Sequence, residues 1–161
     1  KAPRGSNMHI LIAMAALVTA EFCAAPIEGG PGEPQFCRFE HEQTIYTPFF
    51  SVDVHPALLA GVDQSGRRLL ARASLPQGPV DFTILASESC VWSGCRVEES
   101  EIVIGSMTWS LCDESTEARV QRKLTAQGSD GYLNIFYSYS EPDTAFSELI
   151  DRMLQSIRLQ P

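Results

Sequence analysis

Hydrophobic and polar positions alternate most regularly near the carboxyl end of the chain. One alternating run extends from Ala118 to Ala126, and a second extends from Tyr132 to Tyr139. A period of two is typical of a β-strand with one buried face. The runs are joined by Gly128-Ser-Asp-Gly131, and an Asp-Gly step is a strong hairpin signal because positive φ angles are tolerated there. The pattern therefore predicts a long β-hairpin.

The residues after this hairpin change to a helical period. Apolar residues recur every three or four positions after Pro142, with Asp143 as the expected N-cap. They are Phe146, Leu149, Ile150, Met153, Leu154 and Ile157. A single apolar stripe of this kind predicts an amphipathic helix packed on a sheet.

Shorter runs upstream predict the rest of the sheet. Thr44–Val54 contains Pro48, which divides it into two short strands or restricts it to a sheet edge. Arg67–Leu75 and Val80–Ser87 are expected to pair across a proline-rich turn. Glu101–Leu111 continues the sheet, with Ile102, Ile104 and Trp109 facing inward. The predicted fold class is α+β, mainly an antiparallel β-sheet with a carboxyl-terminal amphipathic helix packed on it.

The amino-terminal part reads as leader and linker. Residues 1–7 resemble an expression scar, and residues 8–25 hold a short apolar run that ends on small residues, as a signal peptide does. The run is shorter than the roughly 20 residues that cross a bilayer. Residues 26–35 are rich in glycine and proline and are expected to form a flexible linker. This leaves one domain over residues 36–161 of a periplasmic or secreted protein, without stable membrane insertion.

Several alternatives stay open for this leader. Cleavage after Ala20 and cleavage after Ala25 both satisfy the small-residue rule. The segment could instead be an amino-terminal helix packed on the domain, and lipidation of Cys23 is a further alternative.

Export makes the 5 cysteines candidates for disulfides. If cleavage follows Ala25, four remain: Cys37, Cys90, Cys95 and Cys112. The expected pairs are Cys90–Cys95, which closes a tight loop, and Cys37–Cys112, which ties the amino-terminal segment to the sheet. Metal binding by Cys90, Cys95 and Cys112 is disfavoured, because their spacing differs from that of a zinc knuckle and no histidine follows at ligand distance. No metal and no cofactor are predicted.

The formal net charge of −8 restricts the possible partners. It opposes binding to nucleic acid and to anionic lipid, and favours a basic protein partner, a cation, or solubility alone. Two acidic segments and an aromatic residue between Cys90 and Cys95 are the candidate contacts, since aromatic residues dominate interface hot spots. The predicted partner-binding residues are Trp92, Glu98, Glu99, Glu101, Asp113, Glu114 and Glu117.

Catalytic chemistry has few candidates in the sequence. There is no Gly-x-Ser-x-Gly motif, and neither acidic segment has the spacing of a calcium loop. Asp53 and His55 lie two residues apart, so both could point the same way from a strand and form an acid–base or metal pair. We predict no catalytic residue.

The order of elements resembles the PsbP/Mog1-like family of small α/β/α sandwiches. Tyr46–Pro56 is similar to the opening strand and turn of that family, and Tyr132–Tyr139 followed by Phe146–Leu159 is similar to its closing strand and helix. Members of the family are mostly non-enzymatic, and they share no catalytic signature that would imply site residues here.

The resemblance and the composition together predict an exported, non-enzymatic protein-binding module. Its most specific form is an immunity protein that neutralises a toxin acting on the cell envelope. An envelope assembly or structural factor of the PsbP type is the alternative. A small hydrolase that uses Asp53 and His55 is the third hypothesis.

Overall fold

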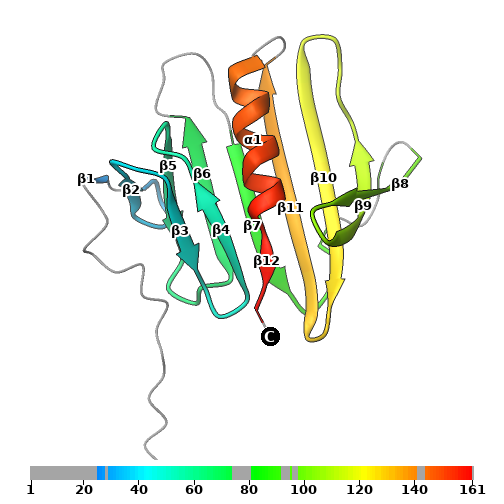
Figure 1. Cartoon of the computed structure of the whole chain (residues 1–161), viewed down its shortest axis with the longest axis horizontal. Helices are drawn as coiled ribbons and strands as arrows, with labels where there is room; N and C mark the ends of the chain where they lie inside the picture. The colour runs from blue at the N-terminus through cyan, green and yellow to red at the C-terminus, as the bar shows by residue number, and fades with distance from the viewer. Residues whose placement is uncertain are drawn as a thin grey trace, which may run out of the picture.

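The computed structural model describes residues 25–27, 29–73, 81–91, 95, 98–140 and 144–160. Within them the chain forms a large antiparallel sheet, a small antiparallel sheet and one α-helix (Figure 1). The large sheet contains β1 (Ala25–Ile27), β2 (Phe36–Arg38), β5 (Leu58–Val62), β6 (Arg68–Ala73), β7 (Asp81–Ser87), β8 (Ser100–Ile104), β9 (Met107–Asp113), β10 (Arg119–Gly128) and β11 (Gly131–Ser140). The remaining elements are β3 (Gln43–Tyr46), β4 (Phe50–Val54), α1 (Thr144–Ser156) and β12 (Arg158–Leu159).

The strand order places chain-distant strands side by side. The large sheet runs β1-β2-β5-β6-β7-β11-β10-β9-β8, and the small sheet runs β12-β4-β3. The strand β7 therefore lies in the middle of the large sheet while its successor β8 lies at one end. The segment between them has to pass three strands, and this passage shapes the candidate site.

The helix α1 and the small sheet together cover one face of the large sheet, which we call the inner face (Figure 1). The core lies between these two layers. Its largest fully buried side chains include Phe50 from β4, Ile150 from α1 and Trp109 from β9. Burial of such apolar surface, worth ~25 cal/mol per Å², holds the layers together.

The most periodic segments fold as predicted. The strands β10 and β11 pair from Arg119 with Ser140 to Gly128 with Gly131, so the hairpin is confirmed. The helix is confirmed over Thr144–Ser156, and Pro48 does divide its run into β3 and β4. In the hairpin turn only Gly131 has a positive φ, of 141°, so Asp130 does not share the left-handed conformation expected for an Asp-Gly step.

The α/β/α sandwich is wrong. The described residues contain a single helix, and the opposite face of the large sheet, the outer face, carries no helical layer. Its side chains give a reason, because polar residues such as Lys123, Thr125 and Thr83 stand there beside a few apolar ones such as Leu85 and Phe136. An antiparallel sheet can leave such a polar face to loops and water, whereas a sandwich needs apolar residues on both faces.

Three shorter segments differ from the sequence prediction. Glu101–Leu111 is not one strand, because a turn at Gly105, with a φ of 62°, folds it into the β8–β9 hairpin. The residues Pro56–Leu59, whose sequence predicts a short turn or helix, instead lead into β5 and contribute Leu58 and Leu59 to it. Ala25, the last residue of the expected signal peptide, pairs with β2 together with Pro26 and Ile27 of the expected linker. Further along that linker, Glu33 and Pro34 lie against the outer face.

Close packing explains why the expected linker has a defined position on the sheet. A Cβ atom on Gly61 of β5 would lie 2.5 Å from the Gln35 carbonyl oxygen, so the segment passes directly over that glycine. Arg72 pairs with Glu33, and Arg68 donates to the Gly32 carbonyl across 2.6 Å. No helix among the described residues is long and apolar enough to cross a membrane.

Candidate functional site

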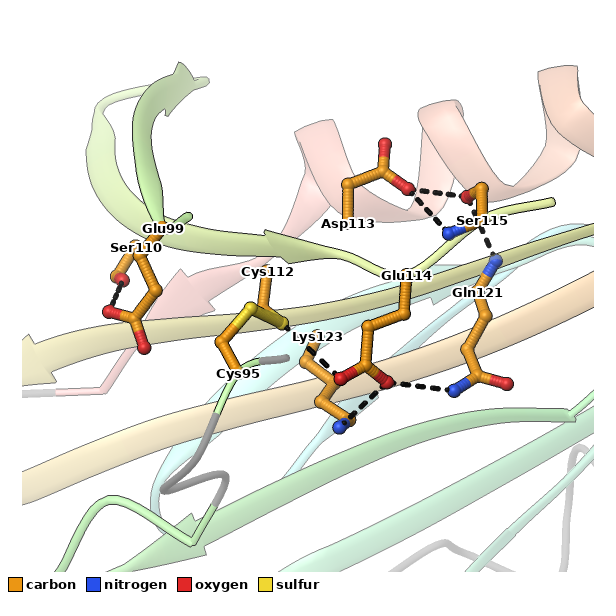
Figure 2. Close-up of a disulfide and its surroundings, with 9 residues drawn as sticks. All are labelled: Cys95, Glu99, Ser110, Cys112, Asp113, Glu114, Ser115, Gln121 and Lys123. Atoms are coloured by element: carbon orange, nitrogen blue, oxygen red, sulfur yellow. Dashed lines mark hydrogen bonds and ion pairs between the residues drawn. A yellow bond between two sulfur atoms is a disulfide. The ribbon is translucent and has the colours of Figure 1, made fainter. Parts of the chain in front are cut away.

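The two acidic segments of the sequence meet at one end of the β8–β9 hairpin. Ser100 pairs with Leu111 and Glu101 pairs with Ser110, so Glu98 and Glu99 lie beside the last residues of β9. Ser110 donates its hydroxyl to Glu99 across 3.1 Å (Figure 2). The register therefore gathers the predicted carboxylates at the edge of the large sheet.

The sheet then divides these carboxylates between its two faces. Asp113 points toward α1 on the inner face, whereas Cys112 and Glu114 point to the outer face (Figure 2). Neighbouring residues of a strand alternate in this way. The predicted contacts thus do not form one continuous patch.

On the inner face, Asp113 is bound by neighbouring donors. Arg122 donates from Nε to Asp113 Oδ2 across 2.8 Å, and the Ser115 amide donates to Oδ1 across 3.1 Å. Burial alone would raise the pKa of the Asp113 carboxyl, but the hydrogen bonds from Ser115 and Arg122 outweigh it and lower that pKa. Burial also raises the pKa of Tyr137, whose hydroxyl accepts from Arg122. Asp113 is therefore a structural partner of Arg122.

On the outer face, Glu114 is likewise engaged. Lys123 Nζ lies 3.0 Å from Glu114 Oε2, and Gln121 donates to the same oxygen across 3.0 Å. Among the described residues, no ion pair holds the other predicted carboxylates, and all four are exposed. They are Glu98, Glu99, Glu101 and Glu117.

A disulfide between Cys95 and Cys112 lies beside this ion pair, with its Cα atoms 5.7 Å apart (Figure 2). The predicted pairs Cys90–Cys95 and Cys37–Cys112 are both wrong. Cys37 is disulfide-bonded, but its strand β2 lies six strand positions from β9, or about 29 Å at ~4.8 Å a step, whereas bonded cysteines need Cα atoms within about 7 Å.

The passage from β7 to β8 explains the observed pairing. Cys90 is a free, exposed thiol whose Sγ lies 3.7 Å from Thr125 Oγ1 on β10. Cys95, five residues further, has reached Cys112 on β9. On the outer face, Cys90 thus lies beside β10 while Cys95 lies beside β9 and is bonded there to Cys112.

Asn134 of β11 anchors the start of this passage. Its side chain is fully buried, and Oδ1 accepts from the Val91 amide across 3.1 Å. Its Nδ2 donates to Ser87 Oγ across 2.9 Å. A buried amide in the middle of a polar sheet face was not singled out by sequence reasoning, because its partners lie far away in the chain.

Among the described residues of β8 and β9, Val103 is the most exposed large apolar side chain. Trp92 lies outside the described residues. Val103 of β8 is 73% exposed and stands next along the same face from Glu101. The sequence could have identified Val103 as exposed, because it stands between Ile102 and Ile104, which were expected to face inward. A strand with one buried face exposes every second side chain.

The described residues of the site include one group of potential metal ligands. Cys95, Cys112 and Glu114 place their ligand atoms within 4.8 Å of one another. The two sulfur atoms are bonded together, however, and the carboxylate is held by Lys123. Zinc binds thiolates, so these residues do not fit a metal while the disulfide is intact.

The proposed acid–base pair lies elsewhere, beside α1. Asp53 and His55 both line a cavity of about 250 Å³. Asp53 accepts from the Thr44 hydroxyl, and His55 Nδ1 accepts from the Ala57 amide across 3.0 Å. No hydrogen bond joins the two side chains within the described part of the chain, so each has a local structural partner.

Comparison with known proteins adds the fold alone. No family model and no curated protein matches the chain. A solved structure from Bacteroides thetaiotaomicron VPI-5482, determined at 1.50 Å resolution, is similar with a TM-score of 0.56 and 11% identity. The match covers 76% of this chain and 50% of the other, so the chain spans about half the length of that protein. The PsbP/Mog1 resemblance stays a prediction.

Proposed function

We propose that the protein is an exported, non-enzymatic protein-binding module that presents β8 to an extended basic segment of its partner. The observation that carries this proposal is the position of Val103. Val103 is 73% exposed on β8, the strand at the edge of the large sheet. It lies beside carboxylates that form no ion pair with any described residue.

The backbone of β8 supplies the means of binding. Among the described residues its only neighbour in the sheet is β9, so one row of N–H and C=O groups faces away from the sheet. Such an edge accepts an added strand, whose main-chain hydrogen bonds provide affinity.

The side chains supply selectivity. Glu101 and Val103 share one face of β8, and Glu99 stands one step beyond them. A strand added there would place every second side chain against Glu99, Glu101 and Val103. This favours a partner segment in which three such alternate positions hold two basic residues, opposite the glutamates, and one apolar residue, opposite Val103. Complementary charge increases the association rate and makes binding sensitive to salt.

The disulfide supports an oxidising compartment, where such bonds form and persist. The most specific form of the proposal remains an immunity protein whose partner is an envelope-targeting toxin. Its alternative, an assembly factor, would use the same edge on a membrane complex.

Site-specific photocrosslinking tests the edge directly. We would place a photoreactive phenylalanine at position 103 or, as the matched control, at position 46, because Tyr46 is 65% exposed on an edge strand of the small sheet. After incubation with the host envelope fraction, we expect a basic protein to crosslink from position 103 and not from position 46.

Charge reversal completes the test. Glu101→Lys together with Val103→Lys is expected to abolish capture of that protein, while Glu117→Lys, which is exposed outside β8, is expected to retain it. Equal crosslinking from both positions, or capture unaffected by the double substitution, would contradict the proposal.

A further inference from the structure

A second cavity, of about 340 Å³, lies at the end of the molecule where three segments meet. Figure 1 shows the turn between β3 and β4, the turn between β10 and β11, and β12 at this common end. All of its lining residues belong to the described part of the chain. The cavity is separate from β8 and plays no part in the function proposed above.

Backbone contacts fix the walls of this cavity. A Cβ atom on Gly131 would lie 2.5 Å from the Ser87 carbonyl oxygen, so only glycine lets the β10–β11 turn approach the end of β7. On the other side, the Gln160 amide donates to the Phe49 carbonyl across 3.0 Å, beyond the pairing of Leu159 with Phe50. These ties make the cavity a preformed feature of the fold.

The floor of the cavity is apolar. Leu133 and Ala86 from the large sheet are buried, and Phe49 and Leu159 contribute further apolar surface. A volume near the lower end of the ~300–1,000 Å³ range of small-molecule sites, with an apolar floor and a few polar groups, is typical of a site for a small ligand.

Arg67 supplies a positive charge at the wall. Its guanidinium stacks over the Phe49 ring, 4.6 Å from the centroid. Within the described residues it has no ion pair and no side-chain hydrogen bond, whereas Arg72, Arg122 and Arg152 each pair with a carboxylate. Stacking holds the planar group in place, and its N–H donors match the two oxygens of a carboxylate.

The rim also carries negative charge. Glu88 and Asp130 line the cavity and are exposed, and no ion pair joins either of them to Arg67. A purely anionic ligand would meet repulsion from these carboxylates, and a purely cationic one would leave Arg67 unused. A ligand that carries both charges satisfies both sides.

We infer that this cavity binds a small zwitterion with an apolar side chain, of the class of a free α-amino acid. Its carboxylate contacts Arg67, its ammonium faces Glu88 and Asp130, and its side chain rests on Phe49, Leu133 and Leu159.

Titration of the full chain with three related compounds tests each element of this inference. L-phenylalanine carries both charges, phenylalaninamide lacks the carboxylate, and N-acetylphenylalanine lacks the ammonium. Backbone amide shifts in the NMR spectrum report binding at Gly128–Leu133. We expect L-phenylalanine to shift these amides with a millimolar Kd, as befits so small a ligand, and both analogues to bind at least about tenfold more weakly.

Variants of the protein provide the second arm. Arg67→Gln is expected to weaken L-phenylalanine binding at least about tenfold, the loss that one charge-assisted contact typically causes. Arg38→Gln, an exposed arginine on β2, serves as the matched control and should bind as the unsubstituted chain does. Three results would overturn the inference: no shifts up to the solubility limit, N-acetylphenylalanine binding as tightly as L-phenylalanine, or Arg67→Gln binding as tightly as Arg38→Gln.

Discussion

Lys123 and Glu114 form an ion pair on the outer face of the sheet, with Nζ 3.0 Å from Oε2, beside the Cys95–Cys112 disulfide (Figure 2). Only 22% of the Lys123 side chain and 13% of the Glu114 side chain are exposed. Water therefore compensates little for the loss of either partner. The pair removes Glu114 from the acidic surface and helps to hold the end of β9 against β10.

Removing Lys123 should therefore lower the stability of the fold. Lys123→Met leaves the Glu114 carboxylate partly buried without its cation, and we expect the free energy of unfolding to fall by about 1–3 kcal/mol. Adding Glu114→Gln should recover much of that loss, because the neutral amide no longer needs a cation. Urea unfolding of the single and double variants measures both effects. A loss of under ~0.5 kcal/mol for Lys123→Met would instead identify an ordinary surface pair.

The Cys95–Cys112 bond should appear in a tryptic digest made without reduction. Cleavage after Arg72, Arg96 and Arg119 places Cys90 and Cys95 on peptide 73–96 and Cys112 on peptide 97–119. The observed pairing joins these two peptides, and mass spectrometry should detect their sum with one thiol open to alkylation. An unlinked peptide 97–119 would contradict the pairing.

Loss of this bond should also lower stability. The cross-link closes a loop with a sequence separation of 17, and such a loop contributes about 3 kcal/mol by restricting the unfolded chain. Cys112→Ala with Cys95→Ala is therefore expected to lower the Tm by roughly 6–12 °C. Cys90→Ser, which removes a free and exposed thiol, is the matched control and should leave the Tm unchanged.

What the sequence could predict was local. Strict alternation over Ala118–Ala126 and the apolar stripe from Phe146 to Ile157 each report one element and its buried face, and both elements are found. The prediction of an α/β/α sandwich was wrong because it depended on which residues lie on the outer face of the large sheet. The polar residues of that face, Lys123 among them, carried this information, but their strand neighbours could not be assigned from one sequence.

The candidate site depended on long-range pairing for the same reason. The position of β8 at the sheet edge requires the order β7-β11-β10-β9-β8, which no local pattern contains. A tight Cys90–Cys95 loop was the natural choice by separation, yet Cys95 is bonded to Cys112 on β9, and two strands, β11 and β10, stand between β7 and β9. Alternating polarity placed Asp113 and Glu114 on opposite faces, and this could have been predicted once β9 was recognised as a strand.

The contact of Asp113 with Arg122 should make the free energy of unfolding depend on pH in the acidic range. The lowered pKa of Asp113 means that the folded state favours the carboxylate more than the unfolded state does. Its contribution is therefore complete above the ordinary aspartate pKa, about 3.9, and is lost as the pH falls through the lower folded-state value. Asp113→Asn should reduce the difference in unfolding free energy between pH 7 and pH 3.

A double-mutant cycle isolates this effect from general acid unfolding. In an Arg122→Gln background, Asp113→Asn should change the pH dependence less, since one of the two residues that lower the pKa of the carboxyl is absent while Ser115 remains. Urea unfolding at the two pH values measures all four proteins. An equal change in both backgrounds would show that Ser115, and not Arg122, accounts for the lowered pKa.

Asn134 should control the passage from β7 to β8 more than it controls the sheet itself. Asn134→Ala removes the acceptor of the Val91 amide and the donor to Ser87, so we expect a loss of about 1–3 kcal/mol in unfolding free energy and faster hydrogen exchange at Val91. Ser138→Ala is the matched control, because Ser138 is equally buried on the same strand but accepts from Arg119. It should lower stability without changing exchange at Val91, and equal exchange there in both variants would show that Asn134 does not anchor the crossing.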